Sequence, residues 1–135
     1  MKKESYSYLL ARLPMGMSFF GHGLIRLTKL SVFSHEMAGQ FSKSILPQNF
    51  VLAFGYVLPF LEFITGFLLL IGLFTRSAIV LGVLIILSLI FGSSLIEQWP
   101  AIFTQLIYGL YLALLFNFIG YNTISIDGWR AGDWK

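Results

Sequence analysis

The chain has 135 residues, of which 57% are hydrophobic and 11% are charged, and its formal net charge is +3. Such a composition excludes a water-soluble globule, because a domain of this length buries only about two-thirds of its surface, and it excludes a disordered chain. Cysteine is absent, which excludes disulfides and iron–sulfur clusters held by this chain. The basic residues form no patch typical of nucleic-acid binding. In a chain this apolar, basic residues are typical of the flanks of membrane helices, so the expected surroundings are a lipid bilayer.

Four apolar segments are each long enough for a membrane-spanning helix of about 20 residues. The first carries several basic side chains, the second carries the single charge of Glu62, and the last two carry none. The sequence therefore predicts an all-α membrane protein, a single domain over residues 1–135, folded as a four-transmembrane-helix up-and-down bundle. The predicted spans are residues 8–30, 50–73, 77–96 and 101–119.

The link between the first two spans predicts a further short helix. Its apolar residues recur at a spacing of four, as Phe33, Met37, Phe41 and Ile45. This spacing is typical of an amphipathic helix lying flat on the membrane surface, so we expect a short interfacial helix between spans one and two. The other two links are short, which indicates antiparallel neighbouring helices.

Basic residues are unevenly divided between the two ends of the predicted bundle. Arg26, Lys29 and Lys43 fall on one side, and twice as many fall on the side of the termini. By the positive-inside rule both termini are expected in the cytoplasm, and the expected membrane is the bacterial inner membrane. The basic residues on the side of the termini are Lys2, Lys3, Arg12, Arg76, Arg130 and Lys135.

Polar side chains on the first two spans form one stripe on each helix. A charge inside a bilayer costs at least about 2.5–3.5 kcal/mol on insertion scales, so these residues need a structural or functional reason. Counting from the outer ends of the spans places Glu62 about 18 Å deep, level with about Ser18. Side chains lean toward the N-terminus of their own helix, which makes His22 the expected partner of Glu62 and lets Arg26 reach part of the way.

Two arginines nearer the cytoplasm complete the candidate intramembrane polar site. Arg12 is expected to snorkel toward the cytoplasm, where Arg76 is its expected neighbour. The whole site could lock two helices in register, or it could bind a ligand, a quinone or a proton. No catalytic residue is assigned, and a metal site at His35 and Glu36 is disfavoured. Residues that could line a cavity are Phe19, Phe63, Gln105 and Tyr108.

Glycines recur within the spans, and we expect them to permit close helix packing. They are Gly16, Gly21, Gly23, Gly66, Gly72, Gly82 and Gly92.

The motifs of the first two spans resemble the DoxX family of small four-helix membrane proteins. Three motifs carry the resemblance. They are a glycine and a basic residue late in the first span, a Glu with a following Gly in the second span, and a Thr-Arg turn after the second span. The tail resembles the family as well. The residues concerned are Arg12-Leu13, Gly16, Phe19-Phe20, His22-Gly23, Arg26-Leu27, Pro59, Glu62, Gly66, Leu69, Gly72-Leu73, Thr75-Arg76 and Ser125-Ile126-Asp127.

The resemblance implies a function, because a relative in this family forms the membrane subunit of a thiosulfate:quinone oxidoreductase. It implies a quinone-interacting membrane subunit of a redox complex, with quinone as the cofactor and membrane redox proteins as partners. The resemblance implies that the functional residues of this chain are Arg12, His22, Arg26, Glu62 and Arg76.

Two other functions stay open at this point. The chain could be a non-catalytic membrane scaffold that stabilises a partner, or a small proton-coupled transporter that uses Glu62. No redox cofactor is evident in the sequence, so electrons would come from a partner protein, and whether the chain is an enzyme is left open. Homo-oligomerisation is a further option.

Overall fold

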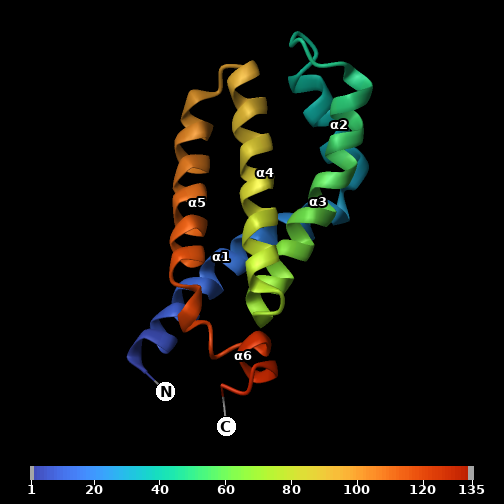
Figure 1. Cartoon of the computed structure of the whole chain (residues 1–135). Coiled ribbons are helices and arrows are strands. Elements are labelled where there is room, and N and C mark those ends of the chain that lie inside the picture. The colour runs from blue at the N-terminus through green and yellow to red at the C-terminus, as the bar shows by residue number, and fades with distance from the viewer. Residues whose placement is uncertain (1, 134–135) are drawn as a thin grey trace.

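The computed structural model describes residues 2–133, so Lys135, which contributes to the predicted charge bias, lies outside the described residues. Every regular element in this range is a helix (Figure 1). The elements are α1 (Lys3–Thr28), α2 (Leu30–Gln40), α3 (Gln48–Ile71), α4 (Thr75–Leu95), α5 (Trp99–Asn117), the 3-10 turn η1 (Ile119–Tyr121) and α6 (Ile126–Arg130).

The helices form an up-and-down bundle in which α1 is oblique. Helices α4 and α5 lie side by side, α1 runs at an angle across the bundle, and both ends of the described chain lie at the same end of the molecule (Figure 1). Helix α3 packs against α1, α2 and α4. Helix α1 meets α5 along its first two-thirds, through contacts that run from Tyr8 to Phe19. This arrangement agrees with short antiparallel connections between the last three long helices.

Three helices in the described range, α3, α4 and α5, are long and apolar enough to cross a membrane. Large apolar side chains cover their outer faces, and Phe103 and Leu110 of α5 are more than 60% exposed. Contiguous exposed apolar surface of this kind suits contact with lipid. Helix α1 has 26 residues, about 39 Å at 1.5 Å per residue, but it carries charges along its length, so its crossing as a fourth span stays a prediction.

Helices α1 and α3 approach each other at backbone contact because glycines lie at their crossing. A Cβ atom built on Gly23 would lie 2.7 Å from the Cα of Phe63, and one on Gly16 would lie 3.0 Å from the backbone nitrogen of Leu70. One on Gly66 would overlap the backbone of Phe20. The predicted role of glycine in close packing therefore holds at these positions, whereas Gly21 faces open space.

Replacing Gly66 with alanine is expected to destabilise the bundle by about 1–3 kcal/mol, the usual cost of overpacking. The new methyl group meets backbone atoms of α1, which cannot rotate away as a side chain could. Gly21→Ala is the matched control, because it adds the same group where nothing lies within 4 Å. Thermal unfolding in detergent measures both; equal midpoints for the two variants would contradict the close crossing.

Helix α2 continues along α3 after α1 ends. Ser34 of α2 is fully buried against Gly55 of α3, and Phe41, just past the end of α2, packs with Val51. The short helix predicted in this link is present, but it lies along the first half of α3, which differs from a helix flat on the membrane surface. Ile45 lies beyond the end of α2 and is 82% exposed, so its assignment to the helix was wrong.

Candidate functional site

An ion pair joins α1 to the middle of α3. Nη1 of Arg26 donates to both carboxylate oxygens of Glu62, at 2.7 Å to Oε1 and 2.9 Å to Oε2. Glu62 is only 4% exposed, and the guanidinium of Arg26 also lies over the ring of Phe33 on α2, 4.6 Å from its centre. The carboxylate therefore has a cationic partner, and the pair ties three helices together.

The partner of Glu62 is Arg26, so the prediction of His22 as its closest partner was wrong. His22 is exposed, and its Nδ1 lies 2.6 Å from the carbonyl oxygen of Ser18 in its own helix. The glycine contacts place Phe63 beside Gly23, so Glu62 lies opposite about residue 24 and not residue 18.

The reason for this shift lies in α2. The prediction took the outer ends of spans one and two as level, but α2 packs along the first half of α3, so α3 begins well beyond the end of α1. The register moves by six residues, from 18 to 24, which is about 9 Å along a helix. The longer side chain of Arg26 then reaches the carboxylate.

The second buried cation is Arg12, which is 2% exposed and does not snorkel as predicted. Its Nε donates to the carbonyl oxygen of Leu69 at 2.8 Å. Its Nη1 donates to Oδ1 of Asn122 at 2.6 Å and to the carbonyl oxygen of Ile124 at 3.2 Å. The segment after α5 folds back across the end of the bundle and supplies the last two acceptors, so Arg12 has a structural role.

Arg76 does not join Arg12. It is exposed at the start of α4, and its guanidinium carbon lies 6.0 Å from the ring centre of Phe116 on α5. The five residues predicted as one polar site therefore lie in separate places: Arg26 with Glu62 between α1 and α3, Arg12 at the C-terminal segment, and His22 and Arg76 on the surface.

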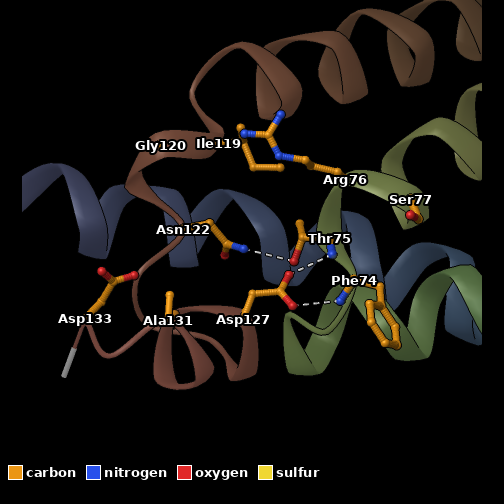
Figure 2. Close-up of a pocket in the computed structure, with 11 residues that line it drawn as sticks. Phe74, Thr75, Arg76, Ser77, Ile119, Gly120, Asn122, Asp127, Ala131 and Asp133 are labelled. Carbon is orange, nitrogen blue, oxygen red and sulfur yellow. Dashed lines mark hydrogen bonds between the residues drawn. The ribbon is translucent and has the colours of Figure 1, made fainter.

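Two residues that the sequence analysis did not place in a site, Asn122 and Asp127, hold the start of α4 (Figure 2). Asp127 accepts hydrogen bonds from the backbone N–H groups of Phe74 at 2.9 Å and Thr75 at 2.8 Å. Nδ2 of Asn122 donates to Oγ1 of Thr75 at 2.9 Å. A carboxylate at a helix N-terminus satisfies unpaired N–H groups and interacts favourably with the helix dipole. The only sequence signal for this cap was the resembling tail around Asp127.

The pKa of Asp127 lies below its ordinary value of 3.8. Burial acts in the opposite direction, but hydrogen bonds from Thr75 and Phe74 and the charge of Arg130 outweigh it. Because the folded state prefers the charged form, this group stabilises the fold fully above pH 3.8, and the contribution is lost as the pH falls through the lower, folded-state pKa.

The thermal midpoint of the wild type is therefore expected to fall more steeply below about pH 4 than that of Asp127→Asn, because asparagine can still cap the helix but has no charge to lose. Thermal unfolding measured between about pH 7 and pH 3 compares the two. Parallel curves would show that the Asp127 carboxylate adds no pH-dependent stability.

A cavity of about 460 Å³ lies between the wall formed by α1, α2 and α3 and the wall formed by α4 and α5. Arg26 borders it, so the ion pair lies at its edge. Most of the lining is apolar and rich in phenylalanine. A second hollow, of about 480 Å³, lies on the outer side of α1 and α2, and Arg26 borders it too. Aromatic residues that line the first cavity are Phe33, Phe41, Phe50, Phe54 and Phe91.

Of the four residues predicted to line a cavity, the structure places Gln105 in this one. Its Nε2 donates to Oγ of Ser93 at 3.1 Å. Tyr108 instead forms a hydrogen bond with Ser18 and an edge-to-face contact with the buried ring of Phe19. Phe63 packs against Phe20, with ring centres 4.9 Å apart, so Phe19, Phe63 and Tyr108 do not line this cavity.

The chemistry of the site follows from these groups. A guanidinium has five N–H donors, so Arg26 can pair with Glu62 and still donate to an oxygen atom of a molecule in the cavity. A carboxylate within a membrane-spanning helix is a candidate functional group, and Asp, Glu and His side chains form the proton relays of pumps and transporters. The aromatic walls suit a flat, apolar ring.

The apolar bundle and its intramembrane ion pair define a helical membrane protein with a ligand-sized cavity. The chain belongs to the DoxX family, whose family model matches residues 7–94. The match extends from α1 to nearly the end of α4 and includes Arg26 and Glu62, whereas α5 and the C-terminal segment lie outside it. No curated protein and no solved structure matches the chain.

Proposed function

We propose that this DoxX-family membrane protein binds a quinone in the cavity beside Arg26 and Glu62 and acts as the quinone-interacting membrane subunit of a redox complex. The observation that carries the proposal is the position of the ion pair at the edge of an aromatic-lined cavity of about 460 Å³. Small-molecule sites of this kind are mostly apolar and have a few well-placed polar groups.

Each part of the cavity has a counterpart in a quinone. The rings of Phe33 and Phe54 offer walls for the quinone ring, and Arg26 offers an N–H group to one ring oxygen. Reduction of a quinone to a quinol consumes two electrons and two protons. In this proposal the electrons come from a redox partner protein in the membrane, and Glu62 passes protons toward the ring oxygen.

The proposed location is the bacterial inner membrane, with both termini in the cytoplasm. Both ends of the described chain lie at one end of the bundle (Figure 1), and the excess of basic residues falls on that side. The cavity lies between the opposite halves of α3, α4 and α5, so in this orientation the quinone enters from the outer leaflet.

Quinone binding to the purified protein in nanodiscs tests the proposal. The double variant Arg26→Met/Glu62→Leu removes both charges together, so no lone charge stays buried. It is expected to weaken the binding of 1,4-naphthoquinone about 10- to 100-fold, the effect of losing one hydrogen bond from a charged donor. Arg130→Met, far from the cavity on α6, is the control. Equal affinity of the double variant and the wild type would overturn the proposal.

The alternative function as a non-catalytic scaffold is favoured by one observation. Both oxygens of Glu62 already accept hydrogen bonds from Arg26, and Arg26 also contacts Phe33. The ion pair therefore needs no ligand to complete it, and joining α1, α2 and α3 is a sufficient role for it. Under this alternative a partner protein co-purifies in a fixed ratio, and 1,4-naphthoquinone changes neither the thermal midpoint of the protein nor that ratio.

A further inference from the structure

The cavity has a second polar end, on the wall opposite Arg26. Gln105 of α5 and Ser93 of α4 line it there, joined by the hydrogen bond from Nε2 to Oγ. The other end of the amide, Oε1, is buried and has no hydrogen-bond partner within residues 2–133. An amide oxygen buried without a partner is unfavourable and therefore calls for an explanation.

A quinol in the cavity supplies the missing partner, because its hydroxyl group donates to Oε1, whereas a quinone oxygen accepts from the second N–H group of Nε2. The last torsion of a glutamine side chain is broad, so the unpaired end of the amide can turn toward the cavity at little cost. We propose that Gln105 is a second ligand-binding residue, which contacts the ring oxygen farther from Arg26 when a quinone is bound. This inference rests on the proposed function and names the class of quinone that the site takes.

Arg26 and Gln105 offer N–H donors from two different helices of the cavity, which suits a ring with oxygens on opposite sides. The other polar residues of the lining are Glu36, Gln40, Ser88, Ser93 and Gln98. Arg26 borders the cavity from α1 and Gln105 from α5, with Phe33 and Leu89 among the apolar lining residues. A para-quinone carries one oxygen at each end of its ring and can engage both. A molecule with a single ring oxygen engages one end only and leaves the other without a partner.

Glutamine also suits both redox states of such a ligand. A quinone oxygen accepts a hydrogen bond, whereas a quinol hydroxyl donates one, and an amide has both a donor and an acceptor group. An arginine can only donate, so Arg26 and Gln105 are not equivalent. Gln105 lies on α5, outside the segment that the family model matches.

The test compares two ligands on one variant. In 1,4-naphthoquinone the ring carries two opposed oxygens, whereas 1-tetralone keeps one. Gln105→Met, which preserves the length of the side chain, is expected to weaken the binding of 1,4-naphthoquinone about fivefold, the effect of one hydrogen bond. The affinity for 1-tetralone is expected to stay within about twofold. Gln48→Met makes the same change at an exposed position outside the cavity and is the matched control.

Each outcome decides the inference. A selective loss for the two-oxygen ligand, repeated in Gln105→Leu and with an unchanged thermal midpoint, supports it. An equal loss for both ligands would overturn it, because Gln105 would then only shape the cavity. If Gln105→Met binds 1,4-naphthoquinone as the wild type does while Arg26→Met/Glu62→Leu does not, this inference fails and the proposed function stands. If the wild type binds neither ligand, both fail.

Discussion

Replacing Arg26 alone with methionine is expected to destabilise the protein by about 3–5 kcal/mol, because Glu62 is then left buried without its cation. The expected cost comes from the carboxylate that stays behind, since its two oxygens both accept from the guanidinium in the wild type. Unfolding by SDS in mixed micelles gives the free energy of unfolding of each variant.

The double variant Arg26→Met/Glu62→Leu identifies the source of that cost. Two apolar side chains can fill the space of a buried ion pair, so most of the lost stability is expected to return. Lys29→Met, an exposed change at the end of α1, is the control and is expected to stay within about 0.5 kcal/mol. A double variant as unstable as Arg26→Met would show that the loss comes from packing and not from the lone charge.

Replacing Arg12 with methionine is expected to cost about 3 kcal/mol or more and to free the C-terminal segment. The change leaves Leu69, Asn122 and Ile124 without the charged donor that pairs with their oxygens, and a hydrogen bond to a charged group contributes about 1.5–3 kcal/mol. Cleavage by trypsin after Arg130, compared with the wild type, reports release of the segment, and SDS unfolding reports the stability.

Two further variants make the Arg12 prediction specific. Arg12→Lys keeps the charge but cannot hold three acceptors in the fork geometry of a guanidinium, so we expect only a partial rescue. Arg76→Met removes an exposed arginine and is expected to change stability by less than about 0.5 kcal/mol. Full rescue by lysine would show that the charge of Arg12 matters and its geometry does not.

Local patterns in the sequence were sufficient for much of the fold. Long apolar runs located α3, α4 and α5, and the motifs of the first two spans led to the DoxX family. The cost of a charge in lipid also indicated that Glu62 needs a basic partner, which the structure provides. These features depend on residues within one helix or on a general energetic penalty.

The parts that the sequence did not reveal depend on how distant elements meet. Choosing between His22 and Arg26 required the register of α1 against α3, which the path of α2 decides. The burial of Arg12 depends on acceptors 110 and 112 residues away. The unpaired oxygen of Gln105 could not be predicted from the sequence, because it depends on the packing of α5 against α4. The residue that Gln105 donates to, Ser93, belongs to α4.

The contact of Arg12 with the C-terminal segment also sets an order of events during biosynthesis. The ribosome adds Arg12 first and Asn122 110 residues later, so for most of translation the guanidinium lacks its final acceptors. A nascent chain cannot place this cation in lipid at low cost before then. If α1 is a fourth membrane span, its buried guanidinium gains its full set of hydrogen bonds only after Asn122 and Ile124 have been added to the chain.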